Sequence, residues 1–247
     1  MQTHSFVRRI TLLCVFMVSA TLTVAEDLPR INLYTETYGT FNFSLEGAAF
    51  EHDAEDIGGT ATEIVKKLFD EADINYKMRL RTWSVSYKRT VERTNYGLFS
   101  TARTESREDL FEWVGPVGHY SWILLAKSGA NLNINSLDDL NGLRIGGYDG
   151  DAATTFLQER GFEVSTLPNE SLNAQRLSNN LIDVWITSDI NGYKIAEESG
   201  YPNVEEAFRI RTVGLYLAMN RGTDPRVVSR LNAAYDRLIA NGEITFD

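Results

Sequence analysis

The chain has 247 residues, with 34 acidic and 24 basic side chains and a net charge of −10 at pH 7. Such an acidic chain lacks the basic face that nucleic-acid binding requires, so we expect no nucleic-acid partner. Cys14 is the only cysteine, so no disulfide can form within the chain and the fold must rely on its hydrophobic core.

The N-terminus has the three parts of a secretory signal peptide. Arg8 and Arg9 form a basic start, residues 10–18 (ITLLCVFMV) are almost entirely apolar, and residues 23–25 (TVA) are small. The apolar stretch is too short to span a membrane. The alternative is an amphipathic first helix of the folded protein. We expect residues 1–25 to be cleaved and the remainder to be exported.

Cleavage would leave a chain with no cysteine and no lipid anchor. Leu13, directly before Cys14, is too large for the cleavage pattern of a lipoprotein. Because the removed residues include two arginines and no acid, the net charge of the remainder is −12. The remaining length of about 222 residues suffices for one large core or two small ones.

The first half of the exported chain alternates between strand and helix patterns. In the helix expected at residues 60–72, four apolar side chains share one face. Strands that alternate with helices favour parallel β-sheets. The expected strands are residues 31–34, 76–81 and 97–100, and the expected helices are residues 60–72 and 84–93.

The second half repeats this alternation. Residues 122–127 (WILLAK) form an apolar strand, and Asp151 is placed to cap the helix that follows it. Two compact α/β lobes are expected, and because open α/β sheets bind ligands at the carboxyl ends of their strands, a cleft should lie between them. The other expected strands are residues 143–147, 182–187 and 213–219, and the expected helices are residues 151–160, 171–179, 190–198 and 224–240.

Two arginines are the first candidate binding groups. Arg103 and Arg107 follow an expected strand within the segment STARTESREDLFEWVGP. An arginine in this position can bind a carboxylate through two parallel hydrogen bonds. The alternative is that either arginine lies at the surface and pairs with Glu105 or Glu108.

Aromatic and capping residues are further candidates. Tyr38 and Trp83 either pack against a ligand or belong to the core. The turn at Gly150, followed by a helix start, would offer backbone N–H groups to an anion. The carboxylate of Asp151 can instead occupy the same N–H groups as a cap.

The sequence contains no motif for metal, nucleotide or acyl-transfer chemistry. The three histidines, His4, His52 and His119, do not lie at metal-ligand spacing, so we expect no metal site. A P-loop, a dinucleotide-binding fingerprint and a G-x-S-x-G elbow are all absent, so we expect no cofactor.

Five segments, in this order, resemble the family-3 extracellular solute-binding proteins, which are the periplasmic receptors of polar amino acid ABC transporters. They are YTETYGTF, GTATEIVKKLF, STARTESREDLFEWVGP, SLDDLNGLRIGGYDGDAATTFL and NNLIDVWITSD. The resemblance implies a periplasmic-binding-protein type II fold, in which two α/β lobes are joined by two hinge strands with a cleft between them. Lobe 1 would comprise residues 26–120 and 213–247, and lobe 2 residues 121–212.

The resemblance also implies site residues. The piece Thr-Glu-Ser-Arg matches the family's Thr-Xaa-Xaa-Arg segment, which makes Arg107 the arginine that holds the α-carboxylate of the ligand. Ser100 matches a small polar position that contacts the ligand. Tyr38 matches the aromatic residue that packs over it.

The chain departs from the family's pattern in three places. Ala102 stands where amino acid binders have Ser or Thr, and Asp151 and Ala152 stand where they have two threonines after a glycine. The acid that holds the α-amino group should fall at Ser188, whereas the nearest acid, Asp189, lies one residue beyond. The resemblance therefore supports the fold more firmly than it identifies the ligand.

The resemblance implies a monomeric receptor without a cofactor. It would bind a small polar, amino acid-like carboxylate between its lobes and deliver it to an ABC transporter permease in the inner membrane. Two alternatives use the same fold. One is an enzyme of the cyclohexadienyl dehydratase type, in which Asp151 or Asp189 would be the acid or base. The other is a ligand-sensing receptor without a transporter.

Overall fold

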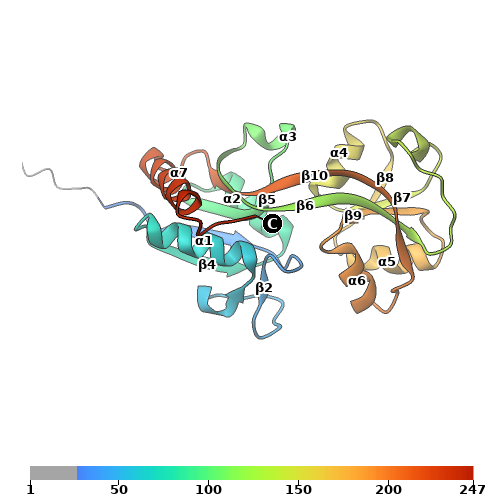
Figure 1. The fold of residues 1–247 in the computed structure, drawn as a ribbon, viewed down its shortest axis with the longest axis horizontal. Coiled ribbons are helices and arrows are strands. Elements are labelled where there is room, and N and C mark those ends of the chain that lie inside the picture. Colours follow the sequence, from blue (N-terminus) through green and yellow to red (C-terminus); the bar gives the residue numbers. More distant parts are fainter. Residues whose placement is uncertain (1–26, 247) are drawn as a thin grey trace, which may run out of the picture.

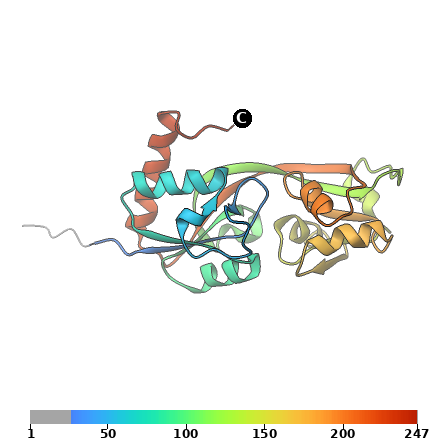
Figure 2. The same cartoon turned by 90° about the horizontal axis from the view of Figure 1, so that it is seen from below.

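A computed structural model describes residues 27–246, so the expected signal peptide at residues 1–25 lies outside the described residues. Two α/β lobes share one eight-stranded sheet with the order β4-β1-β5-β10-β6-β9-β7-β8 (Figure 1). Two strands of 17 residues, β6 (Phe111–Lys127) and β10 (Val204–Asn220), pair antiparallel and run through both lobes. They are the connection between the lobes that both views show (Figures 1 and 2).

The first lobe is built on parallel strands beside β10. β1 pairs with β4 and with β5 in parallel, and β5 pairs antiparallel with the end of β10. Helices α1 and α7 pack on one face of this part of the sheet, and α2 packs on the other. The elements are β1 (Ile31–Thr35), β2 (Phe43–Ser44), β3 (Ile57–Gly58), α1 (Thr60–Glu71), β4 (Tyr76–Leu80), α2 (Trp83–Glu92), β5 (Tyr96–Ala102), α3 (Glu105–Glu108) and α7 (Pro225–Ala240).

The second lobe is built on the other half of β6. There β9 pairs antiparallel with β6 and in parallel with β7, which pairs in parallel with β8. Helix α4 covers one face, and α5 and α6 cover the other. The elements are β7 (Ile145–Tyr148), α4 (Ala152–Gln158), β8 (Val164–Leu167), α5 (Ser171–Ser178), β9 (Val184–Ser188) and α6 (Gly192–Glu198).

Burial on both faces explains the continuous apolar run in β6. Leu124 belongs to the large cluster that includes the side chains of α4, whereas Ile123 and Leu125 belong to the cluster beneath α5 and α6. Successive side chains of a strand point to opposite faces, so a strand covered on both sides must be apolar throughout. The same burial keeps the second lobe together without a disulfide.

The sequence predicted most elements but underestimated the two long strands. The expected strands at residues 122–127 and 213–219 are only parts of β6 and β10, because the polar and glycine-containing remainder of each strand gives no apolar run. The expected cap is confirmed, since the Asp151 carboxylate accepts hydrogen bonds from the backbone N–H groups of Ala153 and Thr154. No helix among residues 27–246 is long and apolar enough to cross a membrane.

We expect Leu33→Ala to lower the free energy of unfolding by about 3 kcal/mol, because it removes a fully buried side chain from β1. Chemical denaturation followed by circular dichroism measures the change. Leu172→Ala is the control, because 42% of this leucine is exposed and its loss should cost less than about 1 kcal/mol. Equal losses in the two variants would contradict the packing described.

Candidate functional site

The carboxyl ends of strands from both lobes meet at one place. The segment after β1 and the end of β5 approach it from the first lobe, and the turn between β7 and α4 approaches it from the second. Together they enclose a cavity of about 20 Å³, which is room for about one water molecule. The lining residues are Thr35, Glu36, Tyr38, Asn42, Trp83, Phe99, Ser100, Ala102, Arg107, Tyr120, Asp151, Ala152 and Leu215.

Arg107 is the one cation of this cavity. Helix α3 carries it, and its side chain is buried, with 6% of the residue exposed. Its Nη2 donates a hydrogen bond of 2.9 Å to the Gly150 carbonyl oxygen of the opposite lobe, and its Nη1 donates one of 3.4 Å to the Ala102 carbonyl oxygen. The rings of Trp83 and Tyr87 lie 5.0 and 5.3 Å from its guanidinium carbon. No carboxylate among the described residues forms an ion pair with it.

The indole of Trp83 also recognises the carbonyl oxygen of Gly150. Its Nε1 donates to that oxygen over 3.1 Å, so two N–H donors from lobe 1 converge on one oxygen from lobe 2. A carbonyl oxygen here stands in chemically for the oxygen of a carboxylate. The arrangement can therefore bind an anionic oxygen between the lobes.

Arg103 lies apart from this cavity. It forms a two-pronged ion pair with Glu108 and packs over the rings of Trp113 and Tyr216. About 41% of its side chain is exposed. The two arginines of this segment therefore divide between the alternatives that the sequence left open, one at the surface and one in the cavity.

Ser100, Asn42 and Tyr38 form the polar and aromatic wall on the lobe 1 side. The Ser100 hydroxyl donates to the Asn42 side-chain oxygen over 2.9 Å. The Asn42 amide nitrogen, which is buried, has no hydrogen-bond partner among the described residues. Tyr38 stacks beside Phe41 and meets the edge of Tyr120. Asn42 was not a candidate from the sequence, because nothing in a polar loop distinguished it.

Three carboxyl groups crowd the same space. Burial, together with the charges of Glu170 and Asp151, raises the pKa of Glu36 to about 8. Burial also raises the pKa of Glu170 to about 7, although hydrogen bonds from Thr187 and Asn191 oppose the shift. Burial raises the pKa of Asp151, while Arg107 and the backbone N–H groups that it caps oppose this effect.

Sequence analysis missed both glutamates. Glu36 directly follows β1 and lies two residues beyond the strand expected at residues 31–34, and this position near a strand end was its only signal. Glu170 directly precedes α5, but the preceding strand β8 was not predicted, so nothing placed Glu170 at a strand end. Glu170 does not line the cavity itself. Its carboxylate accepts hydrogen bonds from the Thr187 hydroxyl (2.6 Å) and the Asn191 amide (3.3 Å) beside it.

Ser188 and Asp189, at the end of β9, point in different directions. The Ser188 hydroxyl is buried next to Tyr38 and accepts a hydrogen bond of 3.1 Å from the Asn191 backbone N–H. Asp189 accepts from the Ser121 backbone N–H and from Arg209 on the hinge strands, at 2.9 and 2.7 Å. Asp189 does not line the cavity, because its pairing with Arg209 holds it at the hinge. Trp83, Ala102 and Ala152, by contrast, line the cavity with Arg107.

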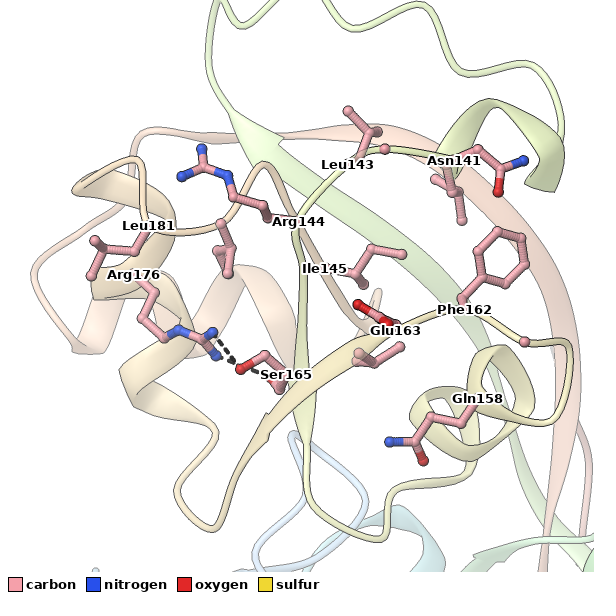
Figure 3. A pocket seen from close by; sticks show the side chains of 15 residues that line it. Asn141, Leu143, Arg144, Ile145, Gln158, Phe162, Glu163, Ser165, Arg176 and Leu181 are labelled. Carbon is pink, nitrogen blue, oxygen red and sulfur yellow. Dashed lines mark hydrogen bonds between the residues drawn. The ribbon is translucent and has the colours of Figure 1, made fainter.

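A second groove lies at the far end of lobe 2 (Figure 3), beside the amino ends of β7 and β8. Its two arginines are already engaged. Arg144 forms a two-pronged ion pair with Asp183, and Arg176 donates to the backbone and side-chain oxygens of Ser165. No set of three or more His, Cys, Asp or Glu side chains within residues 27–246 is arranged to hold a metal ion.

Comparisons with known proteins identify the fold. No protein-family model and no curated protein matches the chain. Many solved structures are similar to it, among them the following three. A histidine kinase sensor domain with similarity to periplasmic binding proteins has a TM-score of 0.74 at 18% identity, over 87% of this chain and 92% of that one. An ancestral arginine-binding protein bound to glutamine has a TM-score of 0.69 at 17% identity, over 86% of this chain and 93% of that one.

The third is a substrate-binding protein of an ABC uptake transporter from Streptococcus pneumoniae with bound histidine. Its TM-score is 0.69 at 14% identity, over 87% of this chain and 88% of that one. All three neighbours are binding or sensor proteins rather than enzymes. The chain therefore has the periplasmic-binding-protein type II fold that the sequence predicted.

The raised pKa of Glu36 makes stability depend on pH. The folded protein keeps a proton on this carboxyl up to about pH 8, whereas its ordinary pKa is 4.5. The folded state thus binds more protons, and the stabilisation is full below pH 4.5 and is lost as the pH rises through 8. We expect the melting temperature to fall between about pH 5.5 and about pH 8.5, and to fall less in Glu36→Gln. Differential scanning fluorimetry measures both slopes.

Glu108→Gln is the matched control for this prediction. Its ion pair with Arg103 lowers the pKa of Glu108, so this group titrates below the window and its removal should leave the slope unchanged. A Glu36→Gln variant with the slope of the parent protein would show that Glu36 does not hold the proton.

Proposed function

We propose that this protein is an exported receptor that binds a small, amino acid-like carboxylate between its lobes, without catalysing a reaction. One observation carries the proposal. Arg107 is buried between the lobes and forms no ion pair with a carboxylate of residues 27–246, and its Nη2 converges with the Nε1 of Trp83 on a single oxygen atom. Two fixed N–H donors beside a buried cation suit a carboxylate better than any neutral group.

The other lining residues suit the remainder of an amino acid. Tyr38 and Trp83 offer aromatic faces, and Ser100 and Asn42 offer a hydroxyl and an amide. Ala102 and Ala152 leave space where a hydroxyl would otherwise stand. A ligand pocket of this kind has a mainly apolar and aromatic wall with a few polar groups that fix the orientation of the ligand.

Ligand entry requires the lobes to separate. A cavity of about 20 Å³ cannot hold an amino acid, and Gly150 already occupies the donors of Arg107. Only β6 and β10 cross between the lobes as continuous strands, so bending at these strands would open the site as a hinge. A ligand that contacts both lobes binds the closed form better than the open form, and this difference in affinity would favour closure.

The partner that we propose is the permease of an ABC transporter, because the substrate-binding protein of an ABC uptake transporter has this fold. The protein would act there as a periplasmic monomer after cleavage of residues 1–25. A ligand-sensing receptor is the second candidate. It is favoured by the likeness to a histidine kinase sensor domain at a TM-score of 0.74.

We expect Arg107→Ala to raise the dissociation constant of the ligand about 100-fold, equivalent to roughly 3 kcal/mol, because it removes the buried partner of the carboxylate. Isothermal titration calorimetry with the standard amino acids identifies the ligand and measures the loss. Arg103→Ala is the matched control from the same segment, because Arg103 pairs with Glu108 at the surface. It should change the affinity by less than about threefold.

Two results would contradict the proposed function. The first is that no amino acid binds the parent protein at millimolar concentration. The second is that an amino acid binds Arg107→Ala and the parent protein equally well, which would place the carboxylate elsewhere.

A further inference from the structure

The charges around the cavity do not balance. Lobe 1 contributes Glu36 and lobe 2 contributes Asp151 and Glu170, whereas Arg107 is the only cation among the lining residues. The negative charge of Asp151 has partners within the protein. Its carboxylate caps α4 through hydrogen bonds of 2.8 and 3.3 Å, and the charge of Arg107 is close enough to lower the pKa of Asp151. Glu36 and Glu170 are left without a cation.

Neutral donors are the only described partners of these two glutamates. Glu36 accepts hydrogen bonds from the Tyr148 hydroxyl, over 3.4 Å, and from the backbone N–H of Trp83. Glu170 accepts from Thr187 and Asn191. The two carboxyl groups come from opposite lobes, and the charge of Glu170 acts on Glu36 across the interface. A positive group placed between them would bind to both lobes at once.

Asn42 is an independent sign that a ligand occupies this cavity. Only 1% of this residue is exposed, and its side-chain oxygen is taken by Ser100. Its amide nitrogen lines the same cavity and has no hydrogen-bond partner within the described part of the chain. A buried donor without a partner is costly, so its retention points to a ligand acceptor.

We propose that the ligand is a cationic amino acid, with Arg107 holding its carboxylate and Glu36 and Glu170 receiving its positive charges from the two lobes. This inference rests on the proposed function and adds the class of ligand. A ligand with one carboxylate and two cationic groups has a net charge of +1. Arg107 and the two ionised glutamates together carry a charge of −1. The ligand's charge of +1 neutralises it.

The same geometry disfavours the other classes of amino acid. An acidic side chain would meet Glu36 and Glu170 with a like charge. A neutral side chain would leave the two half-buried carboxyl groups without a counter-charge, so each would either keep its proton or carry an unpaired charge, which is unfavourable. The selectivity would thus come from repulsion as much as from attraction.

Protonation of the glutamates gives the proposal a second readout. The groups that face Glu36 are Glu170, Asp151, Tyr148 and the backbone of Trp83, and together with burial they leave its pKa near 8. Without a cation, a carboxyl in this position holds a proton at neutral pH. A cationic group replaces that proton, so binding releases protons and strengthens as the pH rises from about 6 to about 8.

Arginine and citrulline form the test pair, because they have nearly the same shape and differ by one positive charge. Calorimetry at pH 8 should show that arginine binds at least about tenfold more tightly than citrulline. Both ligands carry an α-ammonium group, so one of the variants Glu36→Gln and Glu170→Gln should weaken both ligands alike. In the other variant the ratio should fall below about threefold while citrulline binds as before, which also shows that this variant is folded. In Glu108→Gln, which alters a surface ion pair, the ratio should not change. Titrations in buffers of different ionisation enthalpy should show more proton release with arginine than with citrulline.

The outcomes separate this inference from the proposed function. If citrulline or glutamine binds as tightly as arginine, or if both glutamine variants keep the tenfold preference, the cationic ligand is wrong and the receptor function stands. If neither charged nor neutral amino acids bind, both proposals are wrong.

Discussion

The burial of one arginine side chain constrains the rest of the site. The guanidinium group of Arg107 is a cation with five N–H donors, yet only 6% of the residue is exposed. Its acceptors are backbone carbonyl oxygens, one from Ala102 in its own lobe and one from Gly150 in the other. Helix α3 carries Arg107, and the turn before α4 contains Gly150. The two segments lie close enough for the guanidinium group to reach the Gly150 carbonyl oxygen. A ligand carboxylate would serve the same donors more strongly, because hydrogen bonds between charged groups are stronger than those to a neutral oxygen.

The carboxyl groups around this arginine connect binding to the relative position of the lobes. Burial raises the pKa of Glu36 and of Glu170, and the charges of Asp151 and Glu170 add to the shift of Glu36 in the present arrangement of the lobes. The closed arrangement is thus favoured by protons or by a cation, each of which reduces the negative charge. Among the described strands, only β6 and β10 continue from one lobe to the other, so only these two would have to bend for the lobes to separate. In the function that we propose, affinity, proton binding and hinge bending are therefore aspects of one equilibrium.

The sequence predicted the fold well because its signals are local. Apolar periodicity located the helices, and the cap at Asp151 was visible as an acid after a glycine turn. The site was harder to predict, because it depends on contacts between distant segments. Arg107 was found through a resemblance, whereas Glu36 and Glu170 belong to no motif and become neighbours only when the lobes meet. Asp189 was a candidate because it is the nearest acid to the position that the resemblance implied. Its pairing with Arg209, 20 residues away along the chain, could not be predicted from the sequence.

The most direct test of the account is an experimental structure of the protein with the ligand that copurifies from its own cell. The account predicts density for a small carboxylate in the cavity between the lobes, with its oxygens within hydrogen-bond distance of Arg107 and Trp83. The carbonyl oxygen of Gly150 would then have left its present position. A ligand bound in the groove at the far end of lobe 2, with Arg107 still bonded to Gly150, would contradict the account.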